Sequence, residues 1–348
     1  MSGAKLVQVE ECNSTQEMAV SLYSSGELEL GSAVLARRQS AGRGRRGRQW
    51  TTADSALALT VVLPAPARQT QWGLEPLRVG LAVLSACQCP ELRLKWPNDV
   101  VLGLPGVGSP GPCGWGNWRK LGGILCELSQ ADRPGAAPQW VVAAGIGMNL
   151  GAFGGATEVQ SVADAPPARP ANVLTLAASL AGGASVAAGD SPAAGPLLPA
   201  GACPAGRGGE EGDAGGDGAG ATAVGAGAVE PGAPAPWAIS AAHAAALTGS
   251  QDLARLAATP RAELAARIVA HLEQSAGTTA QELVREYAQH CVTLGQPVRV
   301  QLCPDGSASA GDLSGTAVGI APTGALLVET GGEVREVSAG DVTLRTGQ

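Results

Sequence analysis

Residues 42–50 read GRGRRGRQW and concentrate positive charge on a glycine-rich segment. Four arginines lie within six positions: Arg43, Arg45, Arg46 and Arg48. Glycine lets the backbone approach a ligand closely, and arginine offers paired donors to phosphate or carboxylate. The segment therefore predicts a loop that closes over an anionic ligand. A solvated basic loop and an RNA-binding arm are the alternatives.

Two further segments place polar groups beside apolar runs. In KWPNDV, Pro97 fixes the local turn, and Asn98 and Asp99 follow it, although Asn-Asp after proline is more often a plain turn. Lys120 begins KLGGILCEL, and a lysine that enters a buried strand is costly unless it reaches water or meets an anion. The paired glycines of that segment keep the strand free of bulk, as they would beside a ligand.

A third polar group follows the apolar run QWVVAAGIGMNL. The run fits a central strand, and Asn149 places an amide at the end of it. Ligands of α/β proteins tend to bind at such strand ends. The plain alternative is a residue of the turn that ends the strand.

The spacing of apolar residues predicts the elements that position these groups. Strands are expected at 5–12, 31–39, 55–63, 92–102, 119–129 and 139–149, and helices at 14–26, 75–88, 260–274 and 279–292. The strands at 92–102 and 119–129 are expected to form a hairpin with a long Gly/Pro-rich connection. After Gly295 the pattern has period two, which predicts a small β-barrel of about five strands.

The region 152–236 differs in composition from the rest of the chain. Of the 56 residues in 181–236, 40 are glycine, alanine or proline, and none is aromatic. Such a sequence buries too little apolar surface to offset its ordering entropy. We therefore expect 152–236 to be a disordered insertion.

Charge and cysteine usage exclude some classes of function. The chain has a net charge of −7, much of it in 181–236, which does not support general attraction to nucleic acid or membranes. No apolar run approaches the roughly 20 residues that span a bilayer.

The eight cysteines lack metal-ligand spacing, so reduced thiols are expected. The three histidines lie on expected helices. A cytoplasmic protein is expected because no transit peptide is visible, and an organelle is left open.

Five segments in order resemble the biotin protein ligases: STQ at 14–16, GRGRRGRQW at 42–50, KWPNDV at 95–100, KLGGILCEL at 120–128 and GIGMNL at 145–150. The tail segments GTAVGIAPTGALLVET and AGDVTLR resemble the C-terminal domain of that family. The resemblance implies an α+β fold. A mixed β-sheet catalytic domain flanked by helices, like the class II aminoacyl-tRNA synthetases and the biotin-lipoate ligases, would precede a small SH3-like β-barrel.

The domains then follow as 1–151 with 237–294 for the catalytic domain, 152–236 for the insertion and 295–348 for the barrel. The second mobile loop of the family begins just after the position of Asn149, where the insertion starts here. Trp237 is expected to mark where that loop resumes.

The implied reaction has two steps. Biotin and ATP form biotinyl-5'-AMP and pyrophosphate, and a lysine of a biotin carboxyl carrier domain then takes the biotinyl group. Arginines over the adenylate would neutralise charge and exclude water.

The resemblance implies three groups of site residues. Biotin would be bound by Ser14, Thr15, Gln16, Gln39, Arg43, Gly44, Arg45 and Lys120. The adenylate chemistry would use Arg45, Arg46 and Lys120. ATP and Mg²⁺ would be placed by Trp50, Asn98, Asp99, Asn149 and Arg345, with Mg²⁺ arriving with ATP and no fixed site made by protein alone.

The implied partner is the biotin carboxyl carrier protein of acetyl-CoA carboxylase or a related carboxylase. Only 13 residues precede Ser14, so a DNA-binding helix-turn-helix domain is not expected. No membrane partner is expected, and either a monomer or a homodimer fits. The alternatives are a lipoate or octanoate ligase of the same fold, a nucleic-acid-binding module that uses the Arg-Gly loop, and a protein that holds biotin without turning it over.

Overall fold

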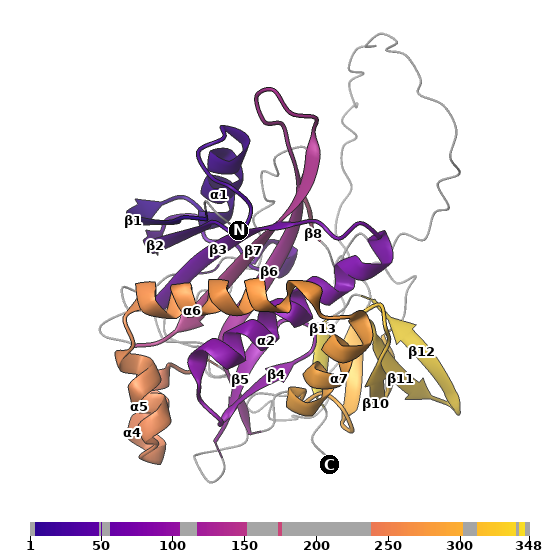
Figure 1. Cartoon of the computed structure of the whole chain (residues 1–348). Coiled ribbons are helices and arrows are strands. Elements are labelled where there is room, and N and C mark those ends of the chain that lie inside the picture. Colours follow the sequence, from indigo (N-terminus) through magenta and orange to yellow (C-terminus); the bar gives the residue numbers. More distant parts are fainter. Residues whose placement is uncertain are drawn as a thin grey trace, which may run out of the picture. The chain divides into compact units, whose positions relative to one another are not determined.

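The computed structural model describes residues 4–48, 50, 56–104, 117–151, 173–175, 238–301, 312–338 and 341–344. All of them belong to one compact unit, made of Met1–Gly182 and Pro231–Gln348. This unit holds two β-sheets and several helices, which confirms the α+β class predicted from sequence (Figure 1). Of the expected insertion at 152–236, only 173–175 lies within the described residues. The predicted domain boundaries therefore stay a prediction.

The larger sheet has eight strands, in the order β1-β2-β3-β7-β6-β5-β4, with β8 paired to β6 beside this path. Its strands are β1 (Leu6–Cys12), β2 (Ala33–Gln39), β3 (Ala56–Pro64), β4 (Leu92–Lys95), β5 (Asp99–Gly103), β6 (Trp118–Ala131), β7 (Gln139–Asn149) and β8 (Val173–Thr175). β1 and β2 run parallel and the other neighbours antiparallel, so the sheet is mixed. β7 lies between β3 and β6, which confirms the expected central strand that ends at Asn149.

The helices within the described residues agree with the predicted ones and add two more. They are α1 (Thr15–Ser24), α2 (Glu75–Cys87), α4 (Ala241–Thr248), α5 (Gln251–Ala258), α6 (Arg261–Gln274) and α7 (Ala280–His290), with 3-10 turns η1 (Arg45–Gly47), η2 (Gln69–Leu74) and η3 (Ser275–Gly277). α7 begins with a capping box between Thr279 and Glu282. The three histidines lie on α4, α6 and α7, as expected.

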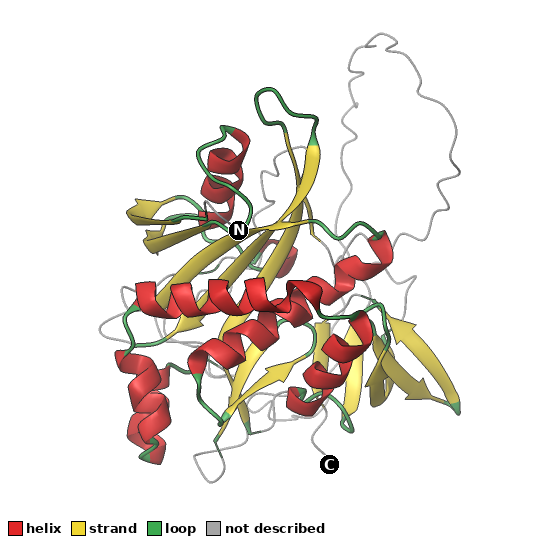
Figure 2. Ribbon diagram, in the orientation of Figure 1, coloured by secondary structure: helices red, strands yellow, loops and turns green. Residues whose placement is uncertain are grey.

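The two faces of the large sheet are covered differently, because successive side chains of a strand point to opposite faces. On β3, Leu59 and Val61 belong to the main core, whereas Val62 belongs to a smaller cluster with residues of α1. α2 and α6 pack on the main-core face, and Figure 2 shows these two helices crossing the strands. α1 contacts β2, β3, β6 and β7 from the other face.

The segment 92–102 forms two strands, where the sequence predicted one. β4 and β5 pair antiparallel, with Lys95 opposite Asp99. Between them, Pro97 lacks the N–H that a strand ladder needs, so the chain turns there. β5 then pairs with β6 and forms the hairpin that was expected. The correction places Asn98 in a turn and Asp99 at the start of a strand.

The smaller sheet has five antiparallel strands, in the order β12-β11-β10-β9-β13, which agrees with the number predicted for the tail. They are β9 (Pro297–Gln301), β10 (Leu313–Ile320), β11 (Leu326–Thr330), β12 (Glu333–Val337) and β13 (Asp341–Leu344). The buried Trp96 donates from its indole to the carbonyl of Gly324 at 2.9 Å. Gly324 has a φ of +87°, and a side chain there would lie 2.5 Å from the carbonyl oxygen of Gly73. Only glycine fits this contact.

The described residues also bear on membranes and thiols. None of the described helices has both the length and the apolarity to cross a bilayer. Five cysteines are described, and all of them carry free thiols, as expected: Cys12, Cys87, Cys89, Cys126 and Cys291. Burial raises the pKa of the Cys87 thiol to about 12, which leaves it protonated and unreactive at neutral pH.

Candidate functional site

The start of α1 is held in a buried hydrogen-bond network. Ser14, Thr15 and Gln16 are each at most 4 % exposed. The backbone N–H and the hydroxyl of Thr15 both donate to Gln39 Oε1, at 2.9 and 3.1 Å. The hydroxyl of Thr60 donates to Thr15 Oγ1 at 2.8 Å. The network fixes the end of β2 against the start of α1 on the α1 face of the sheet.

Gln16 extends this polar group over the central strands. Its amide nitrogen donates to the carbonyl oxygens of Leu125 and Ala143, at 3.0 and 3.2 Å. A side chain at Gly145 would lie 3.0 Å from the Gln16 amide carbon. The strand needs a small residue there because the amide lies directly on it.

The Arg-Gly segment forms a compact loop at the same face. The N–H of Gly44 donates to the carbonyl of Arg48 at 2.7 Å, and that of Trp50 donates to the carbonyl of Gly42 at 2.9 Å. A Cβ atom at Gly42 would lie 2.2 Å from the Trp50 carbonyl oxygen. The glycines therefore allow the two ends of the loop to approach each other, in addition to the exposed backbone predicted from sequence.

Two arginines of the loop reach the sheet. Arg43 forms an ion pair with Glu127 at 2.8 Å, and Glu17 lies 3.9 Å from the same guanidinium. Arg45 donates from Nη1 to Asn98 Oδ1 at 3.0 Å. Sequence reasoning missed Glu127, although a glutamate inside the apolar run ILCEL is an available signal, since a buried carboxylate needs a partner.

Other members of the predicted site are less well defined. Arg48 is exposed, and Gly44 lies in extended backbone before η1. The side chain of Arg46 and all of Arg345 and Trp237 lie outside the described residues.

Asp99 is the centre of a charged group formed by β4, β5 and β6. Lys120 Nζ lies 2.6 Å from Asp99 Oδ1, and Lys95 Nζ lies 3.7 Å from Asp99 Oδ2. Burial by itself would raise the pKa of Asp99, but the charges of Lys120, Lys95 and Arg45 outweigh it and hold that pKa below its usual value. Lys120, near the start of β6, thus meets an anion, as its position in a buried strand required.

Asn98 joins this charged group to the arginine loop. Its amide nitrogen donates to the carbonyl of Ile124 at 2.8 Å, and the N–H of Ile124 donates back to the Asn98 carbonyl at 2.9 Å. The turn is therefore locked to β6, and the Asn98 oxygen that binds Arg45 has a fixed position.

The indole of Trp50 lies over a platform of glycines from β6 and β7. Gly123 and Gly147 face each other across these strands. A Cβ atom at Gly147 would lie 2.4 Å from the indole, and one at Gly123 would lie 3.2 Å from Lys120 Nζ. The indole N–H is buried and makes no hydrogen bond within the described residues. Asn149 lies two positions further along the same face of β7, opposite Ala56.

The described parts of the predicted site thus share one face of the large sheet. Hydroxyl and amide groups gather at the start of α1, and cations gather around Asn98 and Asp99. Such an arrangement suits a ligand with a polar neutral head and an anionic end, because the cations neutralise carboxylate or phosphate. Among the described residues, no group of three or more His, Cys, Asp or Glu side chains is placed to hold a metal.

Two family models match the chain. Residues 9–137 match the biotin/lipoate A/B protein ligase family, and residues 293–345 match the biotin protein ligase C-terminal domain. The first range carries the start of α1, the arginine loop and Lys120, and the second covers the smaller sheet.

Curated relatives match part of the chain. The bifunctional ligase/repressor BirA of Escherichia coli is 38 % identical over 129 residues, which are 36 % of this chain and 35 % of that protein. The biotin--[acetyl-CoA-carboxylase] ligase of Paracoccus denitrificans is 37 % identical over 138 residues, 38 % of this chain and 50 % of that protein. The chain thus spans between a third and a half of the length of these relatives.

A solved structure extends the likeness of fold to the whole chain. The biotin protein ligase of Aquifex aeolicus in complex with biotin and ATP superposes with a TM-score of 0.54 at 20 % identity, over 99 % of both chains. The two matching models, the curated relatives and this shared fold agree with one another. The chain is thus similar to the biotin/lipoate A/B protein ligase family over residues 9–137 and to the biotin protein ligase C-terminal domain over residues 293–345.

Proposed function

We propose that this protein is an ATP-dependent biotin–protein ligase. In the first step, a carboxylate oxygen of biotin attacks the α-phosphorus of ATP, and the bond to the β-phosphate breaks to release pyrophosphate. In the second step, the amine of an acceptor lysine attacks the acyl carbon of biotinyl-5'-AMP, and AMP leaves. The proposed acceptor is a biotin carboxyl carrier domain; the name of the Paracoccus denitrificans relative gives acetyl-CoA carboxylase for that protein.

One observation carries the proposal. The loop that carries Arg43 and Arg45 is far in sequence from Lys120 on β6. All three cations nevertheless lie on the α1 face of the sheet, and each contacts a residue fixed on it. Both anionic groups of the first step, a carboxylate and a triphosphate, need neutralisation before they can approach each other. Fixed cations supply it without reorganisation during the reaction.

The start of α1 provides the second half of the proposed site. The ureido head of biotin has two N–H donors and one carbonyl acceptor, and a buried head needs a partner for each. Ser14, Thr15 and Gln39 offer hydroxyl and amide groups there, and Gln16 lies beside them. We assign the ring of biotin to this end and its carboxylate to the end near Lys120.

The nucleotide falls at the glycine platform in this proposal. Gly123 and Gly147 leave room on the sheet for a flat group, which the indole of Trp50 fills. The indole either stacks beside the adenine or moves aside for it, and Asn149 lies at the same end of β7. The arginine loop would cover the mixed anhydride and exclude water from it.

Mg²⁺ fits the site only together with ATP. The ion prefers oxygen ligands and usually keeps several waters beside one or two carboxylates and substrate phosphates. The charged group offers one carboxylate, that of Asp99, which two lysines already contact. We therefore propose that Mg²⁺ arrives on the phosphates, where it neutralises charge, and that the protein alone does not hold it.

A direct assay tests this proposal. The purified chain is incubated with biotin, ATP, Mg²⁺ and a carboxyl-carrier domain, and the carrier is weighed by mass spectrometry. We expect the mass of one biotinyl group on a single lysine. Parallel reactions with lipoate or octanoate in place of biotin are expected to leave the carrier unmodified. Transfer of lipoate but not of biotin would refute the proposal. The absence of both transfer and pyrophosphate release would refute it as well.

The loop can be tested by one substitution. Arg45→Ala removes the guanidinium that contacts Asn98, and we expect adenylate formation to slow by about 10²-fold, as the loss of one fixed donor does in other enzymes. Arg37→Ala is the matched control, because the Arg37 guanidinium forms an ion pair with the exposed Glu10 at 3.3 Å. Pyrophosphate release in single turnover separates the two variants. Equal rates for both would remove the loop from the mechanism.

A further inference from the structure

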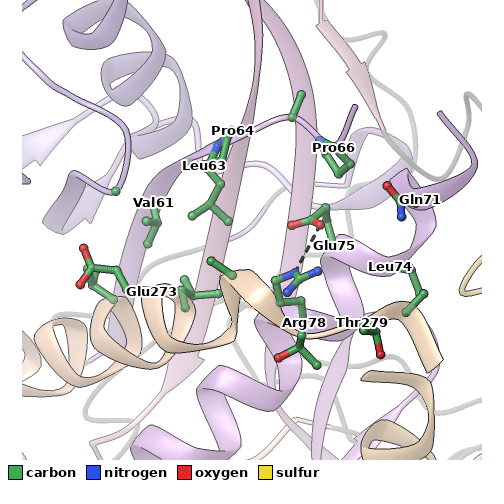
Figure 3. A pocket seen from close by; sticks show the side chains of 17 residues that line it. Val61, Leu63, Pro64, Pro66, Gln71, Leu74, Glu75, Arg78, Glu273 and Thr279 are labelled. Carbon is green, nitrogen blue, oxygen red and sulfur yellow. Dashed lines mark hydrogen bonds and ion pairs between the residues drawn. The ribbon is translucent and has the colours of Figure 1, made fainter. Parts of the chain in front are cut away.

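A cavity of about 300 Å³ lies on the helix-covered face of the large sheet (Figure 3). It is bounded by β3, the segment that follows β3, α2, α6 and η3. Val61 and Leu63 line it, whereas Val62, between them on β3, belongs to the α1 cluster. The sheet therefore separates this cavity from the candidate site.

The walls of the cavity are mostly apolar, but three charged side chains lie among them: Glu75, Arg78 and the exposed Glu273. Glu75 is 5 % exposed, and Arg78 donates from Nε to Glu75 Oε1 at 3.4 Å (Figure 3). Arg78 also donates from Nη1 to the carbonyl of Ser275 and so links α2 to η3. These contacts give the pair a structural role and hold it in place at the cavity.

The pair keeps hydrogen-bonding capacity that the described residues do not use. Within them, no hydrogen bond reaches Glu75 Oε2 or Arg78 Nη2, and the side-chain amide of Gln71 makes none. Burial raises the pKa of Glu75, and Arg78 offsets this only in part. These three residues line the cavity, so a ligand that brings a matching donor and acceptor can pair with them. Such a molecule would use hydrogen-bonding capacity that the fold leaves open.

We propose that this cavity binds a small neutral molecule with a compact apolar body and a cis-amide head, as in a lactam or cyclic urea. The N–H of such a head donates to Glu75 Oε2, and its carbonyl accepts from Arg78 Nη2. The ligand is neutral because Glu75 and Arg78 already balance each other's charge, so a charged ligand would be buried without a counter-ion. The volume is at the lower end for small-molecule sites, and apolar walls with a few polar groups are typical of them.

A matched pair of probes tests the proposal on the full chain. Hydrocarbostyril is a bicyclic lactam, and its N-methyl derivative has the same body without the N–H donor. We expect saturable binding of hydrocarbostyril in ligand-observed NMR titrations, and affinity at least about tenfold lower for the N-methyl compound, which cannot donate to the carboxylate. Saturating biotin and ATP should leave this binding unchanged, because the sheet lies between the two sites.

Two variants locate the binding. Ala276 lines the cavity and is exposed, so Ala276→Trp is expected to block it without replacing a core residue. In Glu75→Gln, Arg78 should turn the amide oxygen towards itself and leave an NH₂ group where Oε2 was, which repels a lactam N–H. We therefore expect this variant to lose the preference for hydrocarbostyril over the N-methyl compound.

The outcomes separate this proposal from the proposed ligase activity, since binding is measured without turnover. Hydrocarbostyril that fails to bind, binds no better than its N-methyl derivative, or is displaced by biotin would overturn the proposal. Unchanged binding to folded Ala276→Trp would do the same.

Discussion

The strand β7 offers different surfaces to the two faces of the large sheet. Towards α1 it presents Gly145 and Gly147, on which a polar amide and an indole lie. Towards the helices it presents Val142, Ile146 and Met148, all in the main core. Alternation along one strand thus gives a candidate binding surface and a core surface. The face of the candidate site is marked by missing side chains and the core face by large ones.

Two buried carboxylates also differ between the two faces, in the direction in which their pKa values are shifted. Burial acts on both to raise the pKa, but the pKa of Asp99 is lowered and that of Glu75 is raised. The difference lies in the neighbours, since Asp99 meets Lys120, Lys95 and Arg45, whereas Glu75 meets Arg78 alone. Around Asp99, the α1 face therefore carries more fixed cations than carboxylates. The helix-covered face has no such surplus around Glu75.

The largest effect is expected from Lys120 on the α1 face. Lys120→Met keeps the length of the side chain and removes its charge, and we expect adenylate formation to fall by about 10²- to 10³-fold. Pyrophosphate release and circular dichroism together check that activity falls while the fold persists.

Arg133→Met is the control for this change, because Arg133 forms an ion pair with Glu29 at 2.8 Å away from the site. The pair is bidentate and the guanidinium lies over the Tyr23 ring, so circular dichroism must show that this variant also keeps its fold. Equal losses of activity in both variants would show that the charge of Lys120 has no specific role in adenylate formation.

Adjacent residues of β7 separate the faces more finely. Ile146→Val should lower the free energy of unfolding by about 0.5–1.5 kcal/mol and leave kcat/KM unchanged, because it trims the core. Gly147→Ala should lower kcat/KM instead, since its Cβ would lie 2.4 Å from the Trp50 indole and displace it. Urea unfolding and steady-state kinetics on both variants measure the two quantities. Full activity of Gly147→Ala would show that the platform is not part of the site.

The smallest effect concerns pH. The folded pKa of Asp99 is lowered, so its stabilising contribution is present above the unfolded pKa of about 3.9 and is lost as pH falls through the folded value. The folded pKa of Glu75 is raised, so ionising it costs stability as pH rises above about 4.3.

Urea unfolding between pH 3 and 7 distinguishes these signs. Asp99→Asn should be less stable than the parent chain by a margin that grows with pH. The stability of Glu75→Gln relative to the parent chain should increase as the pH rises over the same range. Margins that change in the same direction for both variants would contradict the contrast between the two carboxylates.

Much of the fold followed from local pattern. Alternation and apolar runs predicted β3 and β7, and the spacing of Leu264, Ile268 and Leu272 predicted α6, whose buried residues include all three. The predicted turn at Pro97 is confirmed, but the range 92–102 was taken as one strand, because the apolar residues on both sides made the run look continuous. β5 needed the pairing with β6 to become visible as a separate strand.

The candidate site was only half accessible from sequence. Residues such as Arg45 and Lys120 were recognisable by type and by resemblance. The pairings were not, because Asn98 and Glu127 lie 53 and 84 positions from the arginines they contact. Asn98 was predicted as a site residue, but Glu127 was not. The indole of Trp50 on Gly147 is another such contact between distant segments.

The sequence alone determined which residues could carry charge, where glycine had to stand and which segments alternate, since these depend on side-chain chemistry and local spacing. Tertiary structure decided which face each group occupies and which partner it meets. The pKa of a buried carboxylate depends on charges brought to it by chain segments distant in sequence. For that reason the pKa values of Asp99 and Glu75, two acidic residues beside apolar stretches of sequence, shift in opposite directions only in the folded chain.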